Sequence, residues 1–276
     1  MWTWEKTHQL LSDYLRLLRK NEITDEKLAE LKANITKEME QEFEASKIKD
    51  YSVFNRDQKF WLAEHFYQEE VDEEFRKTID KVIANLEAIN KSERKDKLEH
   101  YFKTYKTIYI ENPKTPDYEN MKLHTYFIPE LKQISIMASP DFGAIFGDNN
   151  YTIIDWKTGK ETEITDEITD QLKVYALKVL SKKWKKDLGE IVIKAHEVYL
   201  PSLNSKWWTI TQEDIDYIIN KISQDADFQK QFLVDQDPIK NKALPHTSFK
   251  RTTSAKKCAT CTLRKVCEEL KNFEIN

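Results

Sequence analysis

Glycine is scarce in this chain, at four of 276 residues. P-loop and Rossmann enzymes hold phosphates with glycine-rich loops, so the sequence argues against a nucleotide-binding enzyme of either kind. Charged residues make up 33% of the chain, and together with the low glycine content this favours a helix-rich, well-solvated fold over a sandwich. The length allows one large domain or two small ones, and we expect one.

Long apolar runs are also missing. No segment approaches the ~20 apolar residues that a helix needs to cross a bilayer. The first residues, MWTWEKTHQLL, lack the basic start and apolar stretch of a signal peptide. We therefore expect a cytoplasmic protein with no membrane-spanning helix.

Cysteine is limited to three residues near the C-terminus, Cys258, Cys261 and Cys267. An odd number of closely spaced cysteines fits a metal or cluster site in a reducing compartment better than a disulfide framework. The sequence therefore predicts a second metal-binding region in this tail.

The net charge of −4 does not suggest a nucleic-acid binder, but the charge is unevenly distributed. Between positions 238 and 265 there are eight Lys or Arg residues and no Asp or Glu. The segment KKWKK at 182–186 adds four more cations around Trp184. A strip of one sign favours phosphate binding, although a solvated surface is the alternative. The candidates for nucleic-acid contacts are Lys250, Arg251, Lys256 and Lys257.

The chain changes character near Tyr105. Residues 1–104 show apolar residues at helical spacing, whereas KTIYI, LHTYFI and LKQISIMASPDFGAIF read as short β runs. The turn signal GDNN makes 141–157 a hairpin. A helix follows in TDEITDQLKVYALKVLSKKW, then strands in EIVIKAHEVYL and WWTIT, then a helix capped by Thr211.

This order predicts an α/β fold with a small mixed sheet flanked by helices. We divide the chain into an N-terminal helical region (1–104), a core (105–210) and a C-terminal helix with a basic, cysteine-containing tail (211–276). All three are expected to form one compact domain.

The hairpin carries the residues that can bind a metal ion or take part in catalysis. Because side chains alternate along a strand, Asp155 and Lys157 share one face, and hairpin pairing can bring Asp141 close to them. Two carboxylates, completed by water and a substrate phosphate, suit Mg²⁺ or Mn²⁺. An ordinary surface ion pair is the alternative for Asp155 and Lys157. On the following helix, Gln171 and Tyr175 are four residues apart and share a face.

These segments, SPDFGAIFGDNNYTIIDWKTGK and then QLKVY, closely resemble the RecB-like branch of the PD-(D/E)xK nuclease superfamily. The resemblance implies a restriction-endonuclease-like core. It implies that Asp141, Asp155 and the backbone carbonyl of Trp156 bind the divalent cation. Lys157 would then orient or activate the attacking water.

The resemblance extends to three further groups of residues. Gln171 and Tyr175 would support the lysine or contact the nucleic-acid backbone. A histidine on an upstream helix commonly adds a metal ligand, and the candidate is His65 in FWLAEHFYQEE, with His100 as its rival.

The spacing C-x2-C-x5-C resembles the cysteine triplet that helps to hold a [4Fe–4S] cluster in some RecB-like nucleases, in which a fourth cysteine lies far upstream. This chain has no fourth cysteine. A histidine such as His246 or His8 can complete a zinc site or a cluster, an exogenous ligand or a three-iron cluster can take its place, or the triplet holds no metal.

The leading hypothesis is a metal-dependent nuclease that acts on DNA at single strands or ends, as an exonuclease. The implied partners are DNA and a helicase, CRISPR or defence protein. The alternatives are a non-catalytic module that keeps the fold to bind nucleic acid or a partner, and a redox sensor built on the cysteines.

Overall fold

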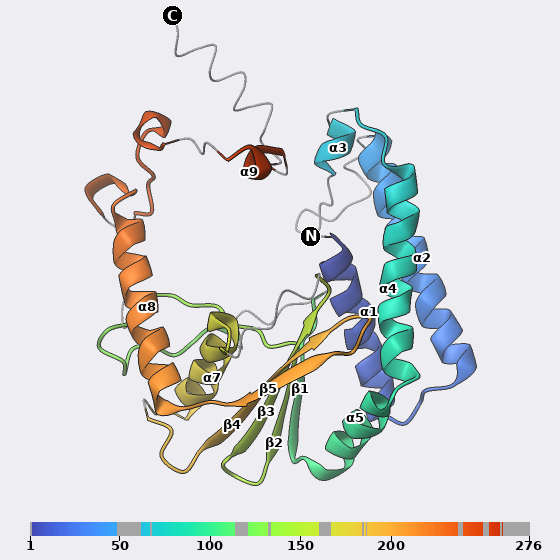
Figure 1. The fold of residues 1–276 in the computed structure, drawn as a ribbon, viewed down its shortest axis with the longest axis horizontal. Coiled ribbons are helices and arrows are strands. Elements are labelled where there is room, and N and C mark those ends of the chain that lie inside the picture. Colours follow the sequence, from blue (N-terminus) through green and yellow to red (C-terminus); the bar gives the residue numbers. More distant parts are fainter. Residues whose placement is uncertain are drawn as a thin grey trace, which may run out of the picture.

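The chain folds as a five-stranded mixed sheet between two groups of helices, seen in the computed structural model from the edge of the sheet (Figure 1). The structure describes residues 2–48, 62–66, 68–113, 121–131, 134–159, 167–183, 185, 187–236, 240–250, 254–259 and 261. The helices are α1 (Trp2–Arg19), α2 (Asp25–Ile48), α3 (Ala63–Phe66), α4 (Asp72–Asn90), α5 (Glu93–Thr104), α7 (Asp170–Lys182), α8 (Gln212–Lys230) and α9 (Ala255–Ala259).

The sheet is built from β1 (Thr107–Ile110), β2 (Phe142–Phe146), β3 (Asn150–Lys157), β4 (Val192–Tyr199) and β5 (Ser205–Thr209), in the order β1-β2-β3-β4-β5. All neighbours are antiparallel except β3 and β4, which are parallel and are separated in the chain by α7. The predicted hairpin is confirmed as β2 and β3, and Gly147 supplies a left-handed residue (φ 62°) in its turn. The mixed sheet confirms the predicted α/β fold class.

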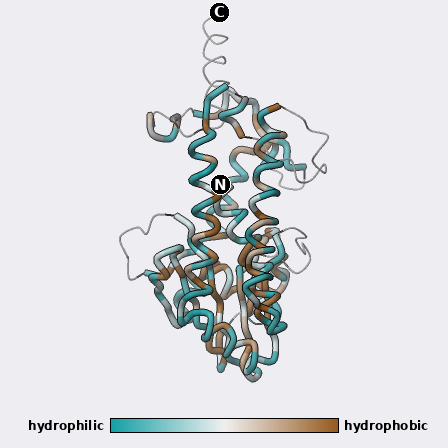
Figure 2. Tube along the Cα trace, turned by 90° about the vertical axis from the view of Figure 1, so that its right-hand side faces the viewer, coloured by the Kyte–Doolittle hydropathy of each residue, from teal (hydrophilic) through white to brown (hydrophobic). Residues whose placement is uncertain are grey.

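Each face of the sheet is covered by one group of helices. Ile154 and Trp156 pack against α1 and α4, whereas Tyr151 and Ile153 pack against α7 and α8. This alternation follows from the period of two in β3. Figure 2 shows hydrophobic residues gathered where the helices meet the sheet.

Helix α1 lies in the middle of the N-terminal group and shares one apolar cluster with β2 and β3. Its charged residue Lys6 is only 2% exposed, and its Nζ lies 2.8 Å from Glu38 Oε1 and also contacts Glu42 on α2. A buried ammonium group is tolerated only when it is paired. These ion pairs therefore fix α1 against α2 at the end where the site described below lies.

Two expectations for local structure had different outcomes. The Thr211 cap is confirmed, because Thr211 and Asp214 form a reciprocal capping box at the start of α8. The β-rich reading of 123–138 was wrong for the described residues there, which hold only a single bridge between Lys122 and Met137. Apolar residues such as Ile128 instead lie in turns and pack into the cluster beneath α7. The apolar residues at 123–138 therefore reflect burial in the core and not pairing in a strand.

No helix among the described residues combines the length and the apolar character that crossing a membrane requires.

Acid is expected to weaken the fold through His196 on β4. Burial lowers the pKa of His196 to about 4, and Arg94 and Lys194 add to this. Between about pH 6.5 and pH 4, His196 therefore binds a proton in the unfolded chain but not in the folded chain. Stability is retained above that window and falls as the pH drops through it, by about 2 kcal/mol at pH 5.

Urea unfolding at pH 7 and pH 5 measures this loss. The His196→Gln variant should lose less stability on acidification than the parent, whereas His100→Gln, at an exposed position on α5, should keep the parent's response. Equal acid sensitivity of the parent and His196→Gln would contradict the assignment.

Candidate active site

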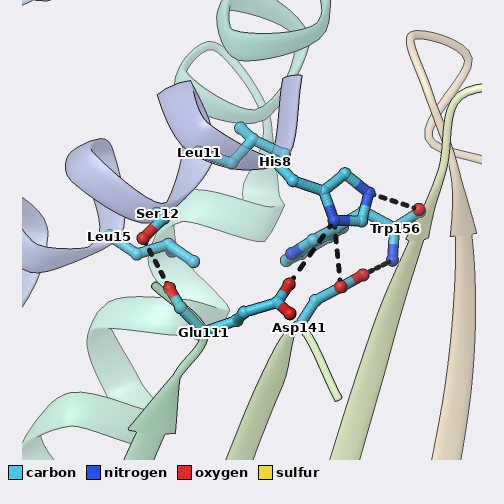
Figure 3. Close-up of a pocket in the computed structure, with 7 residues that line it drawn as sticks. All are labelled: His8, Leu11, Ser12, Leu15, Glu111, Asp141 and Trp156. Carbon is cyan, nitrogen blue, oxygen red and sulfur yellow. Dashed lines mark hydrogen bonds and ion pairs between the residues drawn. The ribbon is translucent and has the colours of Figure 1, made fainter. Parts of the chain in front are cut away.

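A buried polar cluster lies where β1 and β3 end and β2 begins, beneath α1 (Figure 3). Asp141 precedes β2, Glu111 follows β1, and Trp156 is the next-to-last residue of β3. The fourth member, His8, comes from α1. Four segments far apart in the sequence therefore contribute to one site.

His8 connects the helix to the sheet. Its Nδ1 lies 3.0 Å from Asp141 Oδ1 and 3.8 Å from Glu111 Oε2, and its Nε2 lies 3.1 Å from the carbonyl oxygen of Trp156. Burial lowers the pKa of His8, but the carboxylates of Asp141 and Glu111 outweigh it and raise the pKa to about 10. The two carboxylates thus favour the protonated form of His8.

Asp141 is held rigidly in this cluster. Its Oδ2 accepts a hydrogen bond of 2.6 Å from the backbone N–H of Trp156, while Oδ1 faces His8. Burial raises the pKa of Asp141 to about 7, against the lowering effect of His8, and the nearby Asp155 adds to the rise. A buried carboxylate whose pKa is raised in this way is typical of functional sites.

The other predicted residues gather on the α7 side of β3. Lys157 Nζ lies 2.6 Å from Asp155 Oδ2 and donates a 2.5 Å hydrogen bond to Gln171 Oε1. Gln171 Nε2 lies 3.1 Å from Asp155 Oδ1 and 2.7 Å from Tyr175 Oη. Gln171 thus ties the aspartate, the lysine and the tyrosine into one network.

Sequence reasoning missed Glu197, a carboxylate that is 2% exposed. It pairs in register with Asp155 on the parallel neighbour β4, and its Oε1 lies 3.9 Å from Lys157 Nζ. Its two oxygens also accept hydrogen bonds from Thr169 (2.8 Å) and Tyr199 (3.1 Å). The signal was a glutamate inside the apolar strand HEVYL, which suggests a buried charge with a partner.

The donor set fits a divalent cation. His8, Glu111 and Asp141 each offer a ligand atom within 4.8 Å of the others. The cavity between them and Trp156 measures about 10 Å³, close to the room that one water molecule occupies. Carboxylate and carbonyl oxygens suit Mg²⁺ and Mn²⁺, and an imidazole is compatible with Mn²⁺ and other transition ions.

The structure places His65 away from this cluster. Its Nδ1 lies 3.0 Å from Ser46 Oγ, and its ring packs edge-on against Phe43 with centroids 4.7 Å apart. Burial lowers the pKa of His65. His65 on α3 therefore has the contacts of a packing residue. The histidine beside Asp141 is His8, which the sequence analysis considered only as a fourth ligand for the cysteine site. His100, the rival candidate, is exposed on α5.

The C-terminal candidates are described only in part. Cys258 on α9 is exposed and Cys261 is half-buried. Lys250 and Lys257 are exposed. Cys267, Arg251 and Trp184 lie outside the described residues, as does the side chain of Lys256.

Comparison with protein families agrees with this geometry. The sequence profile of the PD-(D/E)XK nuclease superfamily matches residues 5–268. The chain belongs to the PD-(D/E)XK nuclease superfamily. The match begins before His8 and ends after Cys267, so both regions lie within the part that resembles the superfamily. Searches of curated proteins and of solved structures found no match.

The superfamily pattern can be followed in the site itself. Pro140 and Asp141 form the PD element before β2, and Asp155, Trp156 and Lys157 form the D-x-K element on β3. The hairpin register pairs Phe142 with Ile154, so the residues next to them, Asp141 and Asp155, come together at one end of the sheet. In this PD-(D/E)XK chain the two acids thus lie at the same end of the hairpin, and Lys157 lies against Asp155.

Proposed function

We propose that this chain is a divalent-metal-dependent nuclease that hydrolyses DNA phosphodiester bonds, within the RecB-like branch of the superfamily. One observation carries the proposal. His8 from α1 lies against both Asp141 and the carbonyl of Trp156, next to the Asp155 and Lys157 pair. This combination supplies metal ligands and a cation at one point, which is what phosphodiester hydrolysis requires.

The metal ligands in this proposal are His8, Asp141, Asp155 and the carbonyl oxygen of Trp156, with His8 in place of His65. Glu111 supplies a further carboxylate beside His8. The bound Mg²⁺ or Mn²⁺ supplies Lewis acidity toward the phosphate and a nucleophilic water near neutral pH.

The remaining residues position the lysine. Lys157 is proposed to orient the attacking water and to offset charge on the scissile phosphate, because its Nζ is fixed between Asp155 and Gln171. Tyr175 holds the amide of Gln171 through a 2.7 Å hydrogen bond. Glu197, 3.9 Å from the ammonium group, adds a second anion that keeps Lys157 directed into the site.

The finer parts of the proposal concern the substrate and the tail. We assign an exonuclease-type action on ends or single strands, and phosphate contacts to Lys250, Arg251, Lys256 and Lys257. Cys258, Cys261 and Cys267 are proposed to bind a [4Fe–4S] cluster or Zn²⁺. Because His8 is already engaged by Asp141 and Trp156, the fourth ligand is His246 or a group from outside the chain. The proposed partner is a helicase, CRISPR or defence protein.

Cleavage of labelled single-stranded and double-stranded DNA with Mg²⁺ or Mn²⁺ tests the function, with the parent compared with Lys157→Ala. The variant should cut at least about a hundredfold more slowly, since it lacks the cation at the reacting centre, and it should still bind DNA. Equal cutting by both proteins would point to a contaminating nuclease. DNA binding without cutting by the parent would favour a binding module that keeps the nuclease fold.

A further inference from the structure

A groove of about 500 Å³ lies between the C-terminal half of α1 and strand β1. Its walls are Arg16, Arg19 and Lys20 on one side and Ile108, Tyr109 and Ile110 on the other. The proposed reaction uses none of these residues. The groove therefore combines three cations with a half-buried apolar wall along an outermost strand of the sheet.

The groove lies next to the small cavity at His8 along α1. Moving along α1, the cavity is lined by His8 and Ser12, and the groove by Arg16 and then Arg19. Ser12 Oγ and a guanidinium nitrogen of Arg16 both donate to the backbone carbonyl of Glu111, at 2.6 Å and 3.0 Å. Figure 3 shows the first part of this path, where His8 and Ser12 on α1 both face Glu111. One carbonyl thus marks the boundary between cavity and groove.

The charges at the far end of the groove are available to a ligand. Arg16 has Asp13 at 3.6 Å, but Arg19 and Lys20 form no ion pair within the described part of the chain, and both are exposed. Cations in the last turn also favour the helix terminus, so their presence alone does not indicate a ligand. Their position on α1, in a groove beside the cavity of His8 and Asp141, does.

We propose that this groove binds the phosphate backbone of a single nucleic-acid strand whose scissile phosphate lies at His8 and Asp141. The inference rests on the proposed nuclease function and specifies one of its substrate contacts. From His8 to Arg19 the helix rises by about 17 Å, so a strand must extend over several nucleotides to reach from the cavity to Arg19. Arg19 and Lys20 contact the phosphates, and the apolar wall accommodates sugars and bases.

Binding of fluorescein-labelled oligothymidylates to full-length Lys157→Ala protein with Mg²⁺ tests the proposal. Adding Arg19→Ala and Lys20→Ala should weaken binding of an oligomer of about twelve nucleotides by about tenfold and reduce the slope of log K against log salt by about 1.4. A dinucleotide, too short to reach both sites, should bind equally to both proteins.

Arg76→Ala with Lys77→Ala is the matched control, because it removes the same two residue types, an arginine followed by a lysine, from an exposed stretch of α4. Equal weakening by the two double variants would overturn the proposal, since it would reflect net charge alone. Unchanged binding in the groove variant would also overturn it. If the parent cuts DNA while the groove variant binds normally, only the groove assignment fails; if the parent neither binds nor cuts, the nuclease proposal itself fails. Thermal unfolding confirms that each variant is folded.

Discussion

Asp155→Asn is expected to reduce metal-dependent DNA cleavage by about a thousandfold or more, equivalent to ~4 kcal/mol, without lowering the melting temperature of the metal-free protein. The activity is lost because an amide is a poor ligand for Mg²⁺ compared with a carboxylate. The stability is kept because Asp155 is 2% exposed and burial, the largest influence on it, raises its pKa. A buried carboxylate with this property opposes folding at neutral pH.

The neutral side chain keeps one of the two local contacts. The Oδ1 of the asparagine still accepts the hydrogen bond from Gln171 Nε2, whereas its amide nitrogen cannot accept from Lys157 as Oδ2 did. Lys157 keeps the side-chain Oε1 of Gln171 as its acceptor and has the carboxylate of Glu197 3.9 Å away. Differential scanning fluorimetry in EDTA gives the melting temperature, and single-turnover cleavage gives the activity.

Asp225→Asn is the matched control, since Asp225 also pairs with a lysine, Lys221 at 3.5 Å, but on the exposed face of α8. It should cut DNA like the parent. A fall of many degrees in the melting temperature of Asp155→Asn would show that the Asp155 and Lys157 pair is a structural ion pair.

His8→Ala is expected to weaken Mn²⁺ binding by at least about 10- to 100-fold, the loss found when even an outer-shell partner of a metal ligand is removed. The structure gives the reason, because His8 Nε2 faces the carbonyl of Trp156 while its Nδ1 faces Asp141. The same substitution at His65 should leave Mn²⁺ affinity unchanged, since His65 contacts Ser46 and Phe43. Isothermal titration with Mn²⁺ measures both.

The pair of histidine variants separates two assignments. A loss of affinity in His65→Ala alone would restore the assignment made from the sequence and remove His8 from the ligand set. Because both histidines are buried, the melting temperature of each apo variant is needed to show that a change in affinity is not a change in folding. His8→Asn, which fills more of the space, provides a second variant if His8→Ala unfolds.

The relative positions of the candidate site residues near β3 were predictable from the sequence because they depend on local rules. Strand alternation places Asp155 and Lys157 on one face, and helical spacing places Gln171 four residues before Tyr175. The GDNN turn fixes the hairpin, so the residue before β2 meets the end of β3. Each of these relations extends over a few residues or one tight turn.

The histidine and the extra acids were not predictable, because they depend on how distant segments pack. His8 and Trp156 are 148 residues apart, and nothing in MWTWEKTHQLL distinguishes a ligand from a packed histidine. Glu111 is brought in by the pairing of β1 with β2, and Glu197 by the parallel pairing of β4 with β3. The β-like runs at 123–138 misled for a related reason, since short apolar runs do not distinguish strands from buried turns.

The position of His8 on the first helix determines when this centre can exist during protein synthesis. The ribosome makes α1 first, but the residues that face His8 are made only when the chain has reached Trp156, and β3 gains its second neighbour only when β4 has been made. A nascent or prematurely ended chain therefore carries the histidine without its aspartates. The proposed metal site therefore cannot be complete on the ribosome until β4 has been made, which requires about seven tenths of the chain.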